Sequence, residues 1–367
     1  MIPIYEPDIG PLERQYLIET IDSSWISSQG HFINSFEQTF AQRFGVKYGI
    51  ATSNCTTALH LSLVALGIGY GDEVICPDLT FIAPANMIAL TGAYPVLIDV
   101  EEDTWNLSPK LLETAITERT KAIIVVHAFG HAARMQELQD VAAKYDIPII
   151  EDNAESPGAT FKGKLLGTMG KMSCFSFFAN KLLTTGEGGM ILTNDEELNL
   201  KLRELRDHGM SRHQRYHHIE MGFNYRMTNM QGAIGLAQLE RFDEILETRR
   251  KQEEFYFNLL NDNKEFSLRP QQAWSESIHW LMTIKLNIPG IRDILLERLR
   301  EKGVDCRQMI FPVHEAKHFK SNYSSEDYPV SVKISHNSLH LPSSTKLTTE
   351  QIEWIVENLY KSLKEII

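Results

Sequence analysis

The sequence has 367 residues, 43% of them apolar, with a formal net charge of -12 and a pI near 5.6. This length allows a large core and more than one domain, and the acidic balance argues against nucleic acid as a partner, because phosphate backbones need a basic surface. The four cysteines form no CxxC pair and no run of about 18 apolar residues occurs, so we expect a cytoplasmic protein with no disulfide framework and no membrane span.

Between residues 49 and 193, short apolar runs rich in β-branched residues alternate with helix-like stretches. This alternation is typical of a mostly parallel sheet with helices on both faces. Seven strands are expected, at residues 49–53, 73–77, 95–100, 122–127, 148–152, 173–178 and 189–193. Ligands of such sheets bind beyond the carboxyl ends of the strands, so polar residues at those positions are candidates for a site.

The first expected strand runs into ATSNCTTALHL, which predicts a strand, a turn and a helix start. A helix N-terminus presents free N–H groups that can bind an anion. The residues at this position are Ser53, Asn54, Cys55 and Thr56. The same pattern also fits an ordinary helix cap, so by itself it is a weak indication of a phosphate site.

Two carboxylates, Glu151 and Asp152, stand at the end of the expected strand 148–152. Taken alone, such a pair is most simply interpreted as solvated acids that end the strand and cap the next helix. A lysine about thirty positions later, Lys181, favours another interpretation. A Schiff-base lysine, together with an acid that can pair with a cofactor ring nitrogen, indicates pyridoxal phosphate.

Lys181 lies between an apolar run and the loop TTGEGG. Most lysines are exposed, but the phenylalanines before this one indicate burial, and a partly desolvated amine has the lowered pKa that a nucleophile requires. The glycines of the loop allow the backbone to approach a ligand closely. Ser176 could add a hydroxyl to a phosphate site or bond only to the backbone.

The second half of the chain begins with EELNLKLRELRDHG, which predicts a helix ending at Gly209 with Asn194 and Asp195 as candidate caps. Residues 227–260 are expected to be mainly helical and to connect two domains. We expect a large domain at residues 1–245, whose N-terminal segment packs on the small domain, and a smaller α+β domain at 246–367. Thr348 to Gln351 predicts a capping box at the last helix.

Two histidine-rich segments could suggest metal binding. HEAKH at 314–318 matches the zinc-protease pattern H-E-x-x-H, but Pro312 precedes it closely and no third ligand is evident. We expect a short surface turn or a substrate contact there. HQRYHH at 213–218 is expected to be a solvated or substrate-facing loop, and no metal is predicted.

Over nearly the whole chain, the motifs resemble those of the DegT/DnrJ/EryC1/StrS sugar-nucleotide aminotransferases. The segments that carry the resemblance are WISSQG, FEQTFAQRFGVKYGIATSN, GDEVICPDLTFIAPANMI, EDNAES, GTMGKMSCFSFFANKLLTTGEGGMILTND, GFNYRMTNMQGAIGLAQLER and FPVH. The resemblance implies an aspartate aminotransferase-like α/β fold (fold type I), with the seven-stranded sheet in the large domain. It also implies pyridoxal 5'-phosphate as cofactor and a homodimer with active sites at the interface.

Matching positions imply the role of each site residue. Lys181 would be the Schiff-base lysine, Asp152 would pair with the pyridine nitrogen, and Phe81 would stack on the ring. Glu155 would lie near the ring hydroxyl, and Asn224 would reach the phosphate of the neighbouring subunit's cofactor. The implied phosphate contacts are Asn54, Cys55, Thr56 and Ser176, and the implied substrate contacts are Trp25, Ser27, Tyr225, Arg226 and His314. Cys55 departs from the glycine usual in the family.

The implied reaction moves an amino group from L-glutamate to the 4-keto group of a nucleotide-linked deoxysugar, which we expect to be GDP-linked. An aminotransferase for a UDP- or dTDP-linked keto sugar and a cofactor-binding regulator without turnover remain as alternatives. A dehydratase of the same fold is a further alternative, but that branch has histidine where this chain has Lys181, so the lysine argues against it. A zinc hydrolase is the most remote alternative.

Overall fold

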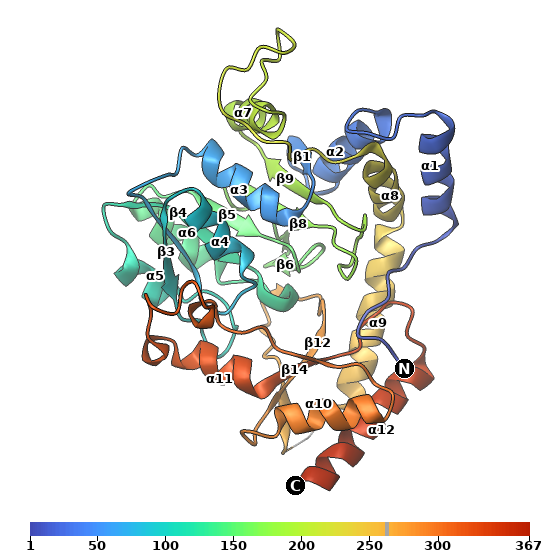
Figure 1. Cartoon of the computed structure of the whole chain (residues 1–367). Helices are drawn as coiled ribbons and strands as arrows, with labels where there is room; N and C mark the ends of the chain where they lie inside the picture. The colour runs from blue at the N-terminus through green and yellow to red at the C-terminus, as the bar shows by residue number, and fades with distance from the viewer. Residues whose placement is uncertain (261–263) are drawn as a thin grey trace.

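A seven-stranded, mostly parallel sheet forms the centre of the larger part of the chain in the computed structural model, which describes residues 1–260 and 264–367 (Figure 1). Its strands, in spatial order, are β1 (Tyr48–Thr52), β9 (Gly189–Thr193), β8 (Met172–Ser176), β5 (Ile149–Asp152), β4 (Thr120–Val126), β2 (Glu73–Pro77) and β3 (Tyr94–Ile98). β9 runs antiparallel to both β1 and β8, whereas the other pairs of this sheet are parallel. The seven expected strands and their mostly parallel arrangement are confirmed.

The sheet is covered on both faces, which explains why its strands are apolar at consecutive positions. Neighbouring residues of one strand belong to different core clusters: Ile123 packs on one side of the sheet and Ile124 on the other. This follows from the alternation of side chains along a strand. The helices around the large sheet are α2 (His31–Arg43), α3 (Cys55–Ala65), α4 (Ala83–Leu90), α5 (Pro109–Ala115), α6 (Met135–Lys144), α7 (Glu196–Arg206) and α8 (Asn229–Glu240).

Helix α7 begins as expected, because the side chain of Asp195 accepts a hydrogen bond from Leu198 N. It ends at Arg206, earlier than the expected end at Gly209. Gly209 has a φ of +62°, so it lies in the left-handed turn that follows the helix.

A smaller part of the chain packs around a four-stranded sheet in the order β10-β12-β14-β13. Its strands are β10 (Phe266–Leu268), β12 (Met282–Leu286), β14 (Ser338–Leu341) and β13 (Arg307–Gln308), and its helices are α10 (Arg292–Glu301), α11 (Pro329–Asn337) and α12 (Thr349–Ile366). A separate three-stranded sheet consists of β11 (Ser275–Glu276), β6 (Thr160–Phe161) and β7 (Lys164–Leu165).

The helix α9 (Phe242–Leu259) connects the two parts without a break, as Figure 1 shows. Phe242 and Ile245 pack in the core of the large sheet, whereas Tyr256 packs in the core of the smaller part. The N-terminal segment, which leads into α1 (Pro11–Asp22), also contacts the smaller part, since Ile2 N donates to Gly303 O at 2.7 Å. A division at residue 245 would therefore fall inside one continuous helix, and it stays a prediction.

The capping box at the start of α12 is confirmed. Thr348 Oγ1 accepts from Gln351 N at 3.3 Å, and Gln351 Oε1 accepts from Thr348 N at 3.0 Å. We expect Thr348→Ala to lower the free energy of unfolding by about 1 kcal/mol, because a helix N–H loses its side-chain acceptor. Urea denaturation measures this loss. Thr349→Ala is the control, because Thr349 is also exposed but caps nothing, and its free energy of unfolding should change clearly less. Equal losses for the two variants would contradict the assignment.

None of the helices described in residues 1–260 and 264–367 is both long enough and apolar enough to span a bilayer.

Candidate active site

The candidate site lies where several strands of the large sheet end at one edge. β1, β5 and β8 run in the same direction, so their carboxyl ends share that edge. Asp152 is the last residue of β5 and Ser176 the last of β8, while β1 leads directly into the start of α3. The sheet topology therefore brings together three segments that are far apart in the sequence.

The start of α3 forms a cradle for an anion. Asn54 is the N-cap, and its side chain accepts from Thr57 N at 2.9 Å. Within the described part of the chain, the backbone N–H groups of Cys55 and Thr56 find no acceptor. A side chain at Gly189 would place its Cβ 2.5 Å from the carbonyl carbon of Asn54, so only glycine fits beside this turn. The free N–H groups and the positive end of the helix suit a phosphate.

Lys181 is mostly buried, close to an acid and an indole ring. Its Nζ lies 3.7 Å from Glu155 Oε1 and 3.5 Å from the centroid of the Trp280 ring. Burial lowers the pKa of the Lys181 amine below its usual value, although the charges of Glu155 and Asp152 partly oppose this. The expectation of a buried lysine is therefore confirmed, and a lowered pKa makes the amine available as a nucleophile and base.

Asp152 is a buried acid beside this lysine. Burial raises the pKa of its carboxyl to about 6, while the N–H of Ala154, which donates to Oδ1 at 3.0 Å, favours the carboxylate. Glu155 is held by Phe129 N, which donates to its Oε2 at 2.7 Å, and burial also raises the pKa of this acid. Phe129 has a φ of +53°, so a left-handed backbone turns this N–H toward Glu155.

Glu151 has a different role from its neighbour Asp152. It is fully buried on the other face of the strand, where it accepts from Gly167 N at 2.9 Å, from Met169 N at 2.7 Å and contacts His127 Nε2 at 3.1 Å. These contacts hold the pKa of the Glu151 carboxyl below its usual value, although burial acts in the opposite direction. The interpretation of the two carboxylates as solvated acids is wrong, because the alternation of the strand buries both, one in a structural network and one in the site.

Residues 224–226 lie beside the anion cradle of their own chain. Tyr225 O accepts from Ser53 N at 2.9 Å, and the Tyr225 hydroxyl lies 3.1 Å from His60 Nδ1. Arg226 donates to Asn224 at 3.0 Å and to Asp207 at 2.5 Å. The contacts of Asn224, Tyr225 and Arg226 with a cofactor or a substrate stay predictions.

Four other predicted site residues are exposed or weakly bonded. Phe81 is 60% exposed ahead of α4, as stacking on a ligand ring would require. Trp25 and Ser27 are also exposed, and their backbone carbonyls accept from Asn229 at 2.6 Å and 2.5 Å. Ser176 Oγ accepts from Phe178 N at 3.4 Å, so its hydroxyl proton stays available for a phosphate.

His314 does not lie on the surface. It is buried in the 3-10 turn η2 (Val313–Glu315), with Nδ1 2.8 Å from Asp78 Oδ2 and Nε2 3.1 Å from Ser325 Oγ. The expected short turn is confirmed, but the expected surface position is wrong for this residue, because Asp78 anchors it to the end of β2. Its predicted contact with substrate would have to replace one of these bonds.

The two histidines of HEAKH have different partners. His318 is exposed and its Nε2 contacts Asn86 Oδ1 at 2.7 Å, whereas His314 contacts Asp78 and Ser325. No group of three His, Cys, Asp or Glu side chains suited to a metal occurs among residues 1–260 and 264–367.

Two residues of the site were not predicted from the sequence. Trp280 contacts the Lys181 amine, and the Tyr5 hydroxyl donates to Lys181 O at 2.9 Å. Tyr5 stands in the N-terminal segment and Trp280 just before β12, so neither has a local pattern that links it to the lysine loop. Only the packing of the smaller part against the large sheet reveals them.

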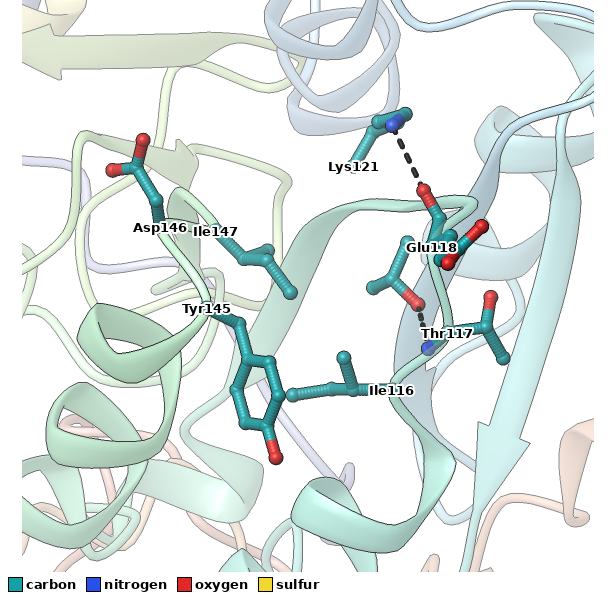
Figure 2. Close-up of a pocket in the computed structure, with 8 residues that line it drawn as sticks. Ile116, Thr117, Glu118, Lys121, Tyr145, Asp146 and Ile147 are labelled. Carbon is teal, nitrogen blue, oxygen red and sulfur yellow. Dashed lines mark hydrogen bonds between the residues drawn. The ribbon is translucent and has the colours of Figure 1, made fainter.

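A surface groove shown in Figure 2 lies at the opposite edge of the sheet. Its lining residues are Ile116, Thr117, Glu118, Thr120, Lys121, Tyr145, Asp146 and Ile147. Thr120 begins β4 and Ile147 precedes β5, whereas the candidate site gathers where strands end. The groove is therefore separate from Lys181 and Asp152.

These residues fit pyridoxal phosphate. The anion cradle offers two N–H groups that have no acceptor among the described residues. Asp152 is a buried acid, and only one of its two carboxylate oxygens receives a hydrogen bond from those residues. Lys181 supplies an amine of lowered pKa. A phosphate, a ring nitrogen and an aldehyde need these three kinds of partner.

Comparisons with known proteins agree with this assignment. The family model described as the DegT/DnrJ/EryC1/StrS aminotransferase family matches residues 7–360. A GDP-perosamine synthase from Caulobacter vibrioides is 43% identical, over 98% of this chain and 97% of its own. A GDP-perosamine synthase from Escherichia coli O157:H7 is 39% identical, again over 98% of this chain and 97% of its own.

Solved structures of a putative sugar aminotransferase from Streptococcus pneumoniae have the same fold. Its PMP-form superimposes with a TM-score of 0.96 at 27% identity and covers 100% of both chains. Its PLP-form gives a TM-score of 0.95 at 27% identity and covers 100% of this chain and 99% of the other.

Proposed function

Because the chain belongs to the DegT/DnrJ/EryC1/StrS aminotransferase family, we propose that it converts GDP-4-keto-6-deoxymannose to GDP-perosamine with L-glutamate as amino donor. The chain is a pyridoxal-phosphate-dependent sugar aminotransferase of fold type I. The GDP-linked substrate is supported by relatives named GDP-perosamine synthase that are 43% and 39% identical over almost the whole chain.

One observation carries the proposed chemistry: Lys181, Asp152 and the N-terminus of α3 meet at one edge of the sheet. The Cys55 and Thr56 N–H groups would bind the cofactor phosphate, with Asn54 shaping the turn and the Ser176 hydroxyl adding a donor. Asp152 would accept a hydrogen bond from the ring nitrogen and favour its protonated form. When bound, pyridoxal phosphate supplies an electron sink for the carbanion formed at the amino donor.

Lys181 would act as nucleophile and as base. Its Nζ would hold the cofactor covalently at rest and, once free, take the proton from the α-carbon of L-glutamate. Burial lowers the pKa of the amine, so a larger fraction is unprotonated near neutral pH. In the second half of the reaction, the same amine would return a proton to the sugar carbon that receives the nitrogen.

The remaining roles stay with the residues that the family resemblance implies. Phe81 would stack on the cofactor ring, and Glu155 would lie near the ring hydroxyl. The substrate contacts proposed are Trp25, Ser27, Tyr225, Arg226 and His314.

We also propose a homodimer in which Asn224 reaches the cofactor phosphate of the neighbouring subunit. The side chain of Asn224 is exposed, and Tyr225 ties its segment to the α3 turn of the same chain. From the edge of its own cradle, each subunit would then offer Asn224 to the cofactor phosphate of its partner. A cytoplasmic location is proposed as well, since the four cysteines are unpaired thiols.

A side-by-side assay tests the substrate. The holoenzyme is given L-glutamate and GDP-, UDP- or dTDP-linked 4-keto-6-deoxysugars, and both 2-oxoglutarate and the amino sugar nucleotide are measured. We expect kcat/KM to be at least about 10-fold higher for the GDP sugar, because recognition of a base by hydrogen bonds discriminates strongly. A preference for another nucleotide would refute the GDP assignment, and no turnover with any sugar, despite bound cofactor, would favour a regulator.

A further inference from the structure

The amine of Lys181 lies between a carboxylate and the face of an aromatic ring. Its Nζ is 3.5 Å from the centroid of the Trp280 ring and 3.7 Å from Glu155 Oε1, and the side chains of Lys181 and Glu155 are each 11% exposed. A cation over an indole face within about 6 Å is attracted by the ring, most strongly where water is excluded. Both neighbours therefore favour the charged form of the amine.

Trp280 is fixed relative to the lysine loop. Its indole Nε1 donates to Asn180 O at 2.6 Å, in the residue before Lys181. Lys181 is held from another side by the Tyr5 hydroxyl, which donates to its backbone carbonyl at 2.9 Å. The ring thus has a defined orientation under the amine.

The segment that carries Trp280 also contacts the turn that holds Glu155. Ile278 N donates to Gly130 O at 3.1 Å, and a Cβ on Gly130 would lie 1.6 Å from Ile278 O, so glycine is required for this approach. The neighbouring Phe129 N donates to Glu155 Oε2 at 2.7 Å. The carboxylate and the ring are therefore parts of one connected structure, and their separation is set by backbone contacts.

We propose that Trp280 is a positioning residue for Lys181, and that its ring and the Glu155 carboxylate form a docking place for the lysine amine whenever it is not joined to the cofactor. This inference rests on the proposed role of Lys181. It adds a part of the site that comes from the smaller sheet, where Trp280 precedes β12.

Removing the ring should not change any charge around the amine. The ionisable groups that act most strongly on Lys181 are Glu155, Asp152 and Cys55. Burial raises the pKa of the Cys55 thiol well above its usual value, so this group stays neutral. Trp280→Leu therefore removes the aromatic face and leaves both carboxylates in place.

The pKa of the Lys181 amine tests the proposal without turnover. The full chain freed of cofactor is acylated with acetic anhydride at a series of pH values, and labelling of Lys181 is quantified by peptide mass spectrometry. Because the ring stabilises the cation, Trp280→Leu should lower the apparent pKa of Lys181 by about 0.4 to 1.5 units. Trp280→Phe keeps a weaker aromatic face and should lower it less.

Trp274→Leu is the matched control, since this tryptophan packs on Arg134 and Phe161 and should leave the Lys181 pKa unchanged. If the Lys181 pKa is unchanged or higher in Trp280→Leu, the proposal is overturned. If the leucine variant does not fold, an unchanged or higher Lys181 pKa in Trp280→Phe overturns it.

Labelling of the holoenzyme separates this inference from the proposed function. If Lys181 binds the cofactor, it should be protected in the holoenzyme and become labelled after treatment with excess L-glutamate. Equal labelling with and without cofactor would contradict the role of Lys181 itself. Protection by the cofactor combined with an unchanged pKa in the Trp280 variants would overturn only the docking place.

Discussion

Lys181→Ala should reduce turnover by on the order of 10³-fold or more and should remove the visible absorbance that depends on covalent attachment of the cofactor to lysine. The expectation follows from the position of the amine, buried 3.7 Å from Glu155 and close to Asp152, where burial lowers its pKa. The variant loses both the nucleophile and the base. The measurements are steady-state rates with L-glutamate and sugar nucleotide, and an absorption spectrum of the purified holoenzyme.

Lys164→Ala is the matched control, because this lysine is exposed on β7, which belongs to the three-stranded sheet and not to the large sheet whose strand ends form the site. It should keep both the spectrum and the rate. If Lys181→Ala keeps them as well, Lys181 is not the catalytic lysine, and the proposed mechanism fails with it.

Asp152→Asn should lower turnover by about 10²-fold or more, since an uncharged amide cannot hold the ring nitrogen in its protonated form. In the cofactor-free protein, by contrast, the same substitution should increase the stability of the fold. The pKa of Asp152 is raised from 3.8 to about 6 in the folded protein, so above pH 6 the buried carboxylate destabilises the wild type by on the order of 3 kcal/mol. The variant should therefore melt at a higher temperature than the wild type above pH 6.

The pH dependence of this stabilisation is a sharper test than its size. Between the unfolded and folded pKa values, from about 4 to about 6, the folded wild type keeps a proton that the unfolded chain has released. The wild type should lose stability relative to Asp152→Asn over this window, and the difference should vanish below about pH 4. Thermal melts of both cofactor-free proteins at several pH values measure it, and a constant difference would contradict the assignment.

The neighbouring acid provides the control. Glu151→Gln should destabilise the protein by about 1 to 3 kcal/mol, because an amide cannot accept all the bonds from Gly167, Met169 and His127 that the carboxylate accepts. Two adjacent carboxylates of one strand should thus have opposite effects on stability. Equal effects would show that burial alone, and not the partners of each acid, decides the result.

Local sequence patterns determined where many of the strands and helices of this protein lie. Apolar runs placed the seven strands of the large sheet, a short polar turn after β1 predicted the start of α3, and a capping box predicted α12. These succeeded because strand formation, helix capping and strand-end placement depend on neighbouring residues. The same reasoning singled out Lys181 and Asp152 as a pair.

Tertiary packing decided what surrounds that pair. Glu151 and Asp152 point to opposite faces of the sheet, and what packs on each face decides that Asp152 belongs to the site. The burial of His314 depends on its contact with Asp78, which is far away in the sequence. Tyr5 and Trp280 reach the lysine loop only because the N-terminal segment and the smaller sheet pack against it. The sequence by itself determined the elements and the reactive groups, whereas long-range contacts, which leave no local periodicity, set the charge and the orientation of the lysine amine.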